Sequence, residues 1–302
     1  MIQTSPFGEY SLYIMQNEKI CAKITDFGAT LVSLKVDGRE TVLGYDSAEQ
    51  YRAGRDFLGA TVGRYANRIA GARFTLDGAE YALPANEGRN QLHGGPASYD
   101  SRRWQAEELA DGLRFTLLSP DGDNGFPGEL RAAVTYRLLE DGLRIDFEGD
   151  CDRPTVYAPT NHSYFDLGAG DALRHELWLN ADTVLAVDGE LIPLEPVPVT
   201  GKFDRRSLGP IGEDLDHCFP LKGEHACTLR GKGLRLDVYT DFPAVQIYTG
   251  IGLQAPWRKN SGVAIEPEFY PDSPNRPDFP STTLRPGEHF HRWAAYRFTA
   301  EA

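Results

Sequence analysis

Apolar and polar residues alternate along much of the chain. Residues 113–118, 134–138, 143–150 and 234–241 each place an apolar side chain at every second position. A pleated strand turns successive side chains to opposite faces, so each run can cover a core on one side and face water on the other. The pattern predicts amphipathic β-strands.

Asp-Gly pairs separate these runs and others like them. They stand at positions 37–38, 77–78, 111–112, 141–142 and 188–189. Asp-Gly adopts the positive φ angles that a two-residue hairpin turn requires. We therefore expect β-hairpins over residues 33–43, 73–83 and 135–147.

Helical patterns are scarce. The strongest candidate, residues 101–111, has only a weak apolar stripe and is equally compatible with a strand that has one polar face. Many hairpins with few helices predict an all-β fold, a sandwich of large antiparallel sheets. The sequence has no internal repeat and no linker-like stretch, although residues 191–204 form a proline-rich loop, so we expect one domain over residues 1–302.

Composition agrees with this view and limits the partners. Glycine (31) and proline (20) make up about 17% of the 302 residues, above the usual ~12%, which suits many tight turns. The net charge is −13 and no long basic block is present. Nucleic acid and anionic membranes attract basic patches, so neither is an expected partner.

We expect the chain in the cytoplasm. No run approaches the ~18 apolar residues of a membrane-spanning helix, and the first residues lack a charged segment followed by an apolar one. The four cysteines are widely scattered, and a reducing compartment would keep them as thiols. They are expected to be small buried apolar residues: Cys21, Cys151, Cys218 and Cys227.

Two segments bring histidines into candidate sites. His162 lies in TNHSYFDL (160–167) and can serve as a buried hydrogen-bonding group, a metal ligand or a proton donor; alone, the segment favours the first. Asn67 and Arg68 precede the hairpin at 73–83 and His93 follows it, so the chain reversal would bring Arg68 and His93 together. Arg and Asn offer forked donors that suit sugar hydroxyls. The alternative is a solvated arginine and a turn histidine.

A carboxylate, Glu266, follows the apolar strand pattern of residues 263–265. Desolvation at such a position raises the pKa of a carboxyl group and makes it a better base near neutral pH. Glu268 shares its face if the backbone stays extended. Both glutamates could instead protect an exposed sheet edge, but the prolines that flank them favour a rigid, ordered segment.

Other signals are weaker. Asp216 and His217 are adjacent on a predicted strand, so they point to opposite faces and are not expected to act as a pair. Three groups are incomplete as metal sites, and no metal is predicted. They are the calcium-like loop 121–129 with Gly125 at its fifth position, the set His217, Cys218, His225 and Cys227, and the pair His289 and His291.

Taken in order, the motifs resemble those of the aldose 1-epimerases, or galactose mutarotases. The likeness runs from about Gly28 to Gly287 through GRYANRIAG, LHGG, TNHSYFDL, LDHCF, VQIYTG and IEPEFYPDSPN. The resemblance implies a large twisted antiparallel β-sandwich, the galactose mutarotase-like supersandwich, with a sugar cleft across one sheet. It also implies a cofactor-independent isomerase that interconverts the α and β anomers of a free aldose such as galactose or glucose.

The resemblance further implies roles for single residues. Glu266 corresponds to the general base, His162 to the general acid and His93 to a second histidine near the ring oxygen. The hydroxyl-binding positions correspond to Asn67, Arg68, Asp216 and Gln246. The expected partner is a monosaccharide, bound by a monomer or a homodimer.

Two features depart from the family pattern. Glu268 occupies a position that is often an amide, and a second carboxylate beside Glu266 can raise the pKa of one of the two. The connection from Gln246 to Glu266 looks shorter than in many relatives. Because this connection borders the expected cleft, the preferred sugar need not be galactose.

Three alternatives stay open. A glycosidase or lyase would pair Glu266 with Asp216 or Glu268, because hydrolysis uses two carboxylates, but it would not call for two histidines. A non-catalytic sugar-binding sandwich would not need the acid and base pair. An epimerase of phosphorylated hexoses would need basic side chains at the cleft edge, for which Arg64 and Arg73 are the candidates.

Overall fold

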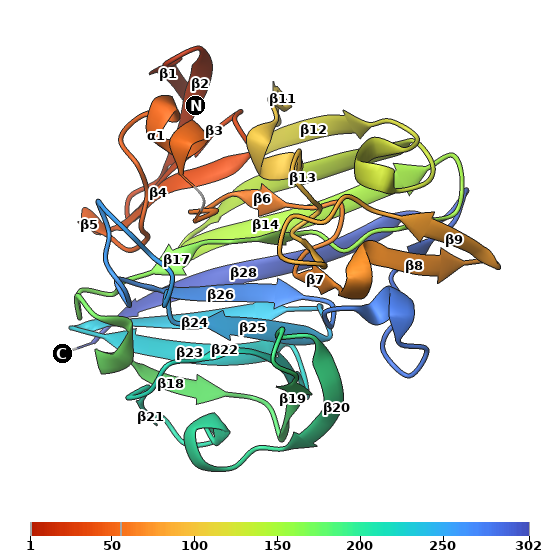
Figure 1. The fold of residues 1–302 in the computed structure, drawn as a ribbon. Coiled ribbons are helices and arrows are strands. Elements are labelled where there is room, and N and C mark those ends of the chain that lie inside the picture. The colour runs from red at the N-terminus through yellow and green to blue at the C-terminus, as the bar shows by residue number, and fades with distance from the viewer. Residues whose placement is uncertain (1, 55, 302) are drawn as a thin grey trace.

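The structure is a computed structural model that describes residues 2–54 and 56–301. Strands arranged in several antiparallel sheets are its main regular structure (Figure 1). The predicted all-β sandwich is confirmed. Within the described residues, no helix is long and apolar enough to cross a membrane.

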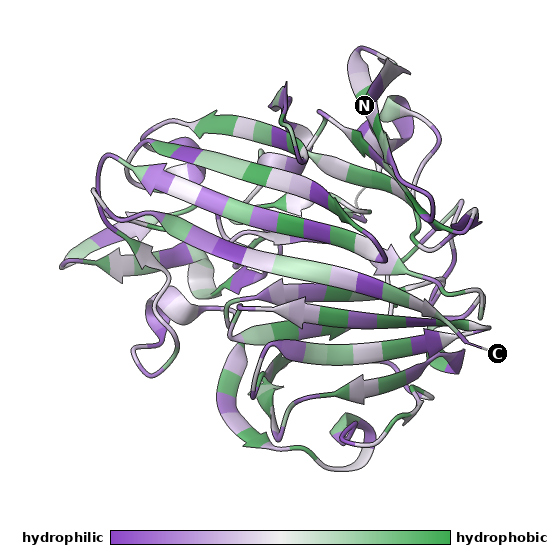
Figure 2. Ribbon diagram, turned by 180° about the vertical axis from the view of Figure 1, so that it is seen from behind, coloured by the Kyte–Doolittle hydropathy of each residue, from purple (hydrophilic) through white to green (hydrophobic). Residues whose placement is uncertain are grey.

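The largest sheet has nine strands and forms the back of the molecule (Figure 2). Purple and green residues alternate along its strands in that view, as the period of two predicts. In spatial order the strands are β11 (Gln105–Glu108), β12 (Leu113–Ser119), β13 (Leu130–Leu139), β14 (Gly142–Cys151), β28 (Phe290–Ala300), β24 (Leu234–Thr240), β23 (His225–Gly231), β18 (Glu176–Leu179) and β21 (Gly209–Pro210).

A five-stranded meander opens the chain. Its strands pair in sequence order, and each is antiparallel to the next. They are β1 (Gln3–Phe7), β2 (Tyr10–Gln16), β3 (Ile20–Thr25), β4 (Thr30–Val36) and β5 (Arg39–Glu40).

A four-stranded sheet carries most of the candidate site. Its order is β17 (Tyr164–Phe165), β26 (Val263–Glu268), β25 (Ala244–Tyr248) and β22 (Asp216–Pro220). Alternation along β26 turns Val263 and Ile265 into the main core and Glu266 and Glu268 to the opposite face. The core contacts on one face thus hold the carboxyl groups on the other.

Five two-stranded pairs complete the sheets. They are β6 (Thr61–Val62) with β16 (Thr160–Asn161), β7 (Arg68–Ile69) with β10 (Gln91–Leu92), β8 (Arg73–Leu76) with β9 (Ala79–Ala82), β15 (Thr155–Val156) with β27 (Thr283–Leu284), and β19 (Thr183–Val187) with β20 (Pro193–Pro198). Short 3-10 turns lie at Ala70–Ala72, Tyr99–Ser101, Asp123–Gly125, Ala172–Arg174, Gly201–Phe203 and Ser273–Asn275.

All three predicted hairpins are present. Strands β4 and β5 meet around Asp37-Gly38, and β8 and β9 meet around Asp77-Gly78, with positive φ at all four residues. The third hairpin joins β13 to β14, but its turn residues are Glu140 and Asp141, because Gly142 already pairs with Leu139. The Asp-Gly signal therefore located this turn to within one residue.

Residues 101–111 contain strand β11, so of the two structures left open for this segment the strand is the observed one. A short helix lies elsewhere, at α1 (Ala48–Ala53). Ser47 and Gln50 cap it reciprocally, which satisfies backbone N–H groups that its first turn leaves free. Six residues are too few for a helical period to be visible in the sequence.

The main core fills the space between the sheets. Trp104, Phe115, Tyr136, Phe147 and Tyr296 are almost fully buried within it. Burial of a large apolar side chain contributes about 1.5–3 kcal/mol, so this core dominates the stability of the fold. All four cysteines are free thiols; Cys218 and Cys227 are buried as expected, while Cys21 and Cys151 are only half-buried.

Candidate active site

A cavity of about 480 Å³ opens on the face of the four-stranded sheet that is turned away from the main core. Its walls come from segments far apart in the sequence. All seven predicted site residues line it: Asn67, Arg68, His93, His162, Asp216, Gln246 and Glu266. The sequence therefore identified a set of side chains that the fold brings to one place.

The pairing of β7 with β10 brings Arg68 and His93 together. Leu92 is the register partner of Arg68, so the chain reversal acts as predicted. The backbone N–H of Asn67 donates to His93 Nδ1 at 3.1 Å, so the hydrogen of the neutral ring is on Nε2. Burial, followed by the charges of His162 and Arg68, lowers the pKa of His93 well below 6.5. His93 is thus a neutral Nε2–H donor.

His162 lies between β16 and β17, and backbone bonds to neighbouring segments fix it in place. Its N–H donates to the Ala60 carbonyl and its carbonyl accepts from Gly59, both at 2.9 Å. His162 Nε2 lies 3.5 Å from Glu266 Oε2. His162 Nδ1 is buried without a hydrogen-bond partner among the described residues. Burial lowers the pKa of His162 to about 4.

Glu266 is on an interior strand, since β26 pairs with both β17 and β25. The alternative that this glutamate protects an exposed sheet edge is therefore wrong. Burial, followed by the charges of Glu268 and Asp216, raises the pKa of Glu266 well above 4.5, with Arg68 opposing the shift. Desolvation thus favours the neutral form of Glu266, as it does for His162.

Two polar pairs flank the cavity. Arg68 donates to both oxygens of Glu87, at 2.7 and 2.8 Å, and Gln246 Nε2 donates to Asp216 Oδ1 at 2.6 Å. These pairs present fixed donors and acceptors to a polyhydroxylated ligand. Glu87 was not among the predicted site residues, because a loop glutamate 19 residues from Arg68 carries no signal of its own.

Asp216 and His217 point apart, as predicted. Asp216 lines the cavity, whereas the His217 ring packs on Phe203 with centroids 4.6 Å apart. Arg64 and Arg73, the candidates for a phosphate site, are not in the cavity wall. The Arg64 guanidinium is buried and donates to the carbonyls of Pro127 and Gly128, so it is a structural group.

Aromatic rings complete the walls. The Phe57 ring lies 4.8 Å from His93 and 5.8 Å from His162, and Tyr164 lies 4.9 Å from His162, measured between ring centroids. Tyr248 and Gln254 come from the connection between Gln246 and Glu266, which borders the cavity as expected. Composition alone could not have assigned these rings.

His93, His162 and Glu266 each offer one ligand atom within 4.8 Å of the others, which invites comparison with a metal site. The donor set argues against one. His93 uses its Nδ1 lone pair to accept from Asn67, so its Nε2 carries hydrogen and has no lone pair for a metal. The three groups are better suited to exchanging protons and hydrogen bonds with a ligand.

An antiparallel β-sandwich that gathers two histidines and a glutamate in one cavity places the chain among the galactose mutarotase-like proteins. Its residues 11–297 match the family described as aldose 1-epimerase. The chain belongs to the aldose 1-epimerase family.

Individual relatives agree. The chain is 40% identical to "Aldose 1-epimerase" of Escherichia coli (strain K12), covering 96% of this chain and 95% of the relative. It is 37% identical to human "Galactose mutarotase", covering 97% and 95%. Among solved structures, an aldose epimerase homologue from C. elegans superposes with a TM-score of 0.93 at 29% identity, covering 97% of this chain and all of that one. Galactose 1-epimerase from Lactobacillus acidophilus NCFM gives 0.90 at 30% identity over the full length of both.

Proposed function

We propose that the chain is an aldose 1-epimerase that interconverts the α and β anomers of a free aldose such as glucose or galactose. The observation that carries this proposal is the 3.5 Å contact between His162 Nε2 and Glu266 Oε2 in the wall of a cavity large enough for a hexose. Family membership and the relatives' names support it.

The chemistry needs two groups because the reacting atoms lie on different parts of the ring. Glu266 accepts the proton of the C1 hydroxyl, the bond from C1 to the ring oxygen breaks, and His162 gives a proton to that oxygen. The open-chain aldehyde then rotates about its C1–C2 bond. Ring closure by the reverse proton transfers forms the other anomer, so the enzyme ends each cycle in its original state.

The other residues bind and orient the sugar. His93 donates from Nε2 toward the ring oxygen region, and Asn67, Arg68, Asp216 and Gln246 hold hydroxyl groups while C1 turns. The pairing of Arg68 with Glu87 and of Gln246 with Asp216 fixes these groups before the sugar arrives. Such preorganisation lowers the entropy loss in the reacting complex.

The proton count of the pair sets the pH dependence. The working state, with Glu266 ionised and His162 protonated, holds one proton, as does the state in which both are neutral. Burial raises the pKa of Glu266 and lowers that of His162, so it favours the neutral pair over the ion pair. The rate should fall at low pH, as His162 takes up a further proton, and at high pH, as Glu266 loses the last one. The profile is bell-shaped, and its acid limb belongs to the imidazole.

The rival functions have weaker support. A glycosidase needs two carboxyl groups beside the substrate, but Glu268 does not line the cavity and Asp216 accepts a hydrogen bond from Gln246. A binding module gains nothing from a buried carboxyl group in contact with a buried histidine. The position of Arg64, buried away from the cavity, disfavours phosphorylated sugars.

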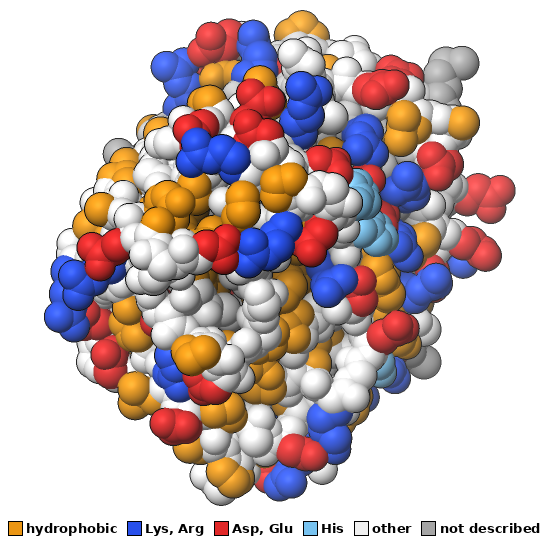
Figure 3. Space-filling model, turned by 90° about the vertical axis from the view of Figure 1, so that its right-hand side faces the viewer, with side chains coloured by type: hydrophobic (Ala, Val, Ile, Leu, Met, Phe, Trp, Pro, Cys, Tyr) orange, Lys and Arg blue, Asp and Glu red, His pale blue; other side chains and the backbone are white. Residues whose placement is uncertain are grey.

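The proposed partner is a monosaccharide, and the proposed location is the cytoplasm. Four free thiols suit a reducing compartment. On the face seen in Figure 3, basic side chains alternate with acidic ones instead of forming the basic patch that nucleic acid or an anionic membrane would attract. Monomer and homodimer both fit this proposal.

Polarimetry tests the function. Freshly dissolved α-D-glucose and α-D-galactose, and then a panel of pentoses, are expected to lose optical rotation faster with the protein than without it. No acceleration with any aldose would contradict the proposal. Release of a reducing sugar from a glycoside would favour the hydrolase instead.

A further inference from the structure

Glu268 is a buried carboxyl group that the chemistry above does not use. It is 1% exposed and does not line the cavity. Its Oε1 accepts a hydrogen bond from Asn67 Nδ2 at 3.0 Å. Its Oε2 is buried and has no hydrogen-bond partner within residues 2–54 and 56–301. A buried carboxylate oxygen in that position is costly, whereas a protonated carboxyl group is much less so.

Glu268 fixes the direction in which Asn67 points. With Asn67 Nδ2 turned to Glu268, Asn67 Oδ1 accepts the backbone N–H of Arg68 at 2.9 Å. The Asn67 backbone, with φ of 62°, directs its own N–H to His93 Nδ1. Asparagine tolerates this left-handed conformation better than most residues. The hydrogen bond that Glu268 accepts from Asn67 therefore supports the orientation of both Arg68 and His93.

The surroundings cannot balance a second negative charge. The titratable groups that face Glu268 are Tyr65, Arg68, Asp216, Cys218 and Glu266. Arg68 is the cation of this set, and the edge of its guanidinium formed by Nε and Nη2 already donates to both oxygens of Glu87. Burial raises the pKa of Glu268 to about 8; the bond from Asn67 and the charge of Arg68 oppose the shift, and Asp216 adds to it.

We propose that Glu268 is a positioning residue that keeps its own proton while Glu266 works as the anion. A neutral carboxyl group still offers its carbonyl oxygen to Asn67, so Asn67 keeps the orientation that positions Arg68 and His93. A neutral Glu268 also leaves Glu266 as the only negative charge of the two glutamates on this strand face. Ionisation of Glu268 would disfavour the carboxylate form of Glu266, because like charges two residues apart on one strand face repel each other. This inference rests on the proposed function.

Three variants separate the effect of the hydrogen bond between Asn67 and Glu268 from the effect of ionising Glu268. Glu268→Leu removes the acceptor of Asn67, so kcat/KM should fall about tenfold or more at every pH. Glu268→Gln keeps an oxygen in the same place and should recover most of that loss. It also cannot ionise, so the ratio of its rate at about pH 9 to its rate at about pH 7 should exceed the wild-type ratio by about threefold or more. Asp146→Asn, which changes a buried carboxylate outside the cleft, should leave the ratio at its wild-type value.

An infrared titration gives a readout that does not depend on turnover. The wild type should show the carbonyl stretch of a protonated carboxyl group at neutral pH that disappears on raising the pH. Glu268→Gln should lose intensity from that band. An unchanged pH ratio in Glu268→Gln, or a loss of activity in Glu268→Gln as large as in Glu268→Leu, would overturn the inference. Absence of mutarotation in the wild type would instead overturn the proposed function.

Discussion

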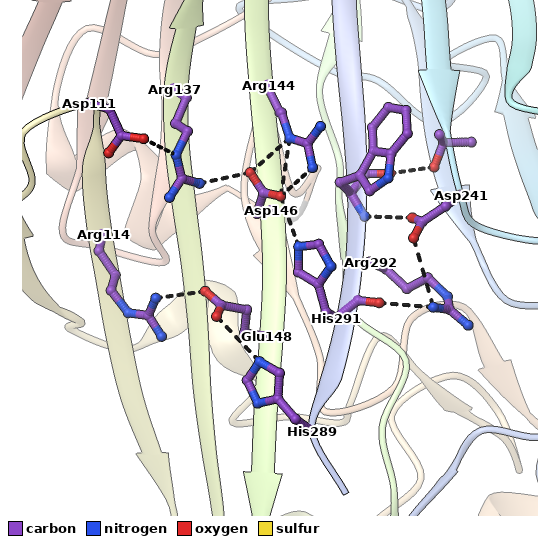
Figure 4. A network of polar contacts seen from close by, with 12 residues as sticks. Asp111, Arg114, Arg137, Arg144, Asp146, Glu148, Asp241, His289, His291 and Arg292 are labelled. Atoms are coloured by element: carbon purple, nitrogen blue, oxygen red, sulfur yellow. Dashed lines mark hydrogen bonds and ion pairs between the residues drawn. The ribbon is translucent and has the colours of Figure 1, made fainter.

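Two buried carboxylates of this chain are held in opposite ways. Asp146, on the outer face of the nine-stranded sheet, is 4% exposed, and Glu266, at the cleft, is 2% exposed. Asp146 accepts hydrogen bonds from Arg137 at 2.9 Å, Arg144 at 2.7 Å and His291 at 2.9 Å (Figure 4). Glu266 has a buried oxygen with no such bond in the described part of the chain.

The two environments shift the pKa in opposite directions. Burial alone would raise the pKa of Asp146, but the bonds from Arg144 and His291 and the charges of Arg144 and Arg137 outweigh it, so the pKa is lowered. At Glu266 burial and neighbouring carboxylates act together, and the pKa is raised. The fold surrounds Asp146 with hydrogen-bond donors and cations, whereas it leaves one oxygen of Glu266 in the cavity wall without a donor. An incompletely satisfied buried polar group in a cavity is typical of functional sites.

The largest effect is expected at His162, which contacts the Glu266 carboxyl group. His162→Asn keeps a polar side chain but removes the proton donor, so the mutarotation rate should fall about 10²- to 10⁴-fold. The urea midpoint should change little, because His162 Nδ1 has no bond to lose. A variant with the wild-type rate would show that another group protonates the ring oxygen.

Asp146→Asn should give the reverse result. It leaves Arg137 and Arg144 without their shared anion, and the unfolding free energy should fall by about 1–3 kcal/mol. Mutarotation should keep its wild-type rate in the folded protein. Urea unfolding and polarimetry on the same sample check both halves, and a loss of activity without a loss of stability would contradict the comparison.

The pH dependence of stability should differ in sign between the two regions. The lowered pKa of Asp146 gives stability that is present above the unfolded value of about 3.9 and is lost as the pH falls through the folded value. Glu268, with a pKa raised to about 8, destabilises the fold increasingly above its unfolded value of about 4.3. Asp146→Asn should therefore flatten the acid side of the stability curve, and Glu268→Gln should raise its alkaline side. Urea midpoints measured from about pH 3 to about pH 9 check both changes. A variant whose stability curve has the wild-type shape would contradict the prediction.

The smallest effect is expected at His289, at the exposed edge of the ion pairs on the outer face of the nine-stranded sheet. His289 is 51% exposed and lies 3.4 Å from Glu148 (Figure 4). It also contacts Asp150 at 2.9 Å. The bond to Asp150, opposed by burial and aided by the charges of both carboxylates, raises the pKa of His289. Its contribution is present below about pH 6.5 and lost as the pH rises through the folded value. His289→Gln should cost less than about 1 kcal/mol at low pH and nothing at high pH; a larger loss would mean that exposed ions of the network are coupled to buried ones.

Much of the fold and of the site could be predicted, because both depend on local patterns. The period of two along β26 places Glu266 opposite a core-facing Ile265, and the Asp-Gly turns fix the hairpins. The proximity of Arg68 and His93 follows from a chain reversal that the sequence already contains, in which Leu92 pairs with Arg68.

The parts that escaped prediction depend on contacts between distant segments. Phe57, with φ of 54°, reaches both histidines, yet its neighbours in sequence give no sign of this. Glu87 becomes a site residue only through Arg68, and Arg64 proved to be buried against the carbonyls of Pro127 and Gly128. Helix α1 is too short to show a period.

The most direct test of the central claim is the rate of mutarotation by Glu266→Gln, followed by polarimetry on a freshly dissolved α-anomer. The amide has the size of the carboxyl group but cannot accept the C1 proton. The rate should fall about 10²- to 10⁴-fold while the urea midpoint stays the same or rises, since an unmatched buried carboxyl group has been removed. A Glu266→Gln protein that interconverts anomers at the wild-type rate would contradict the account.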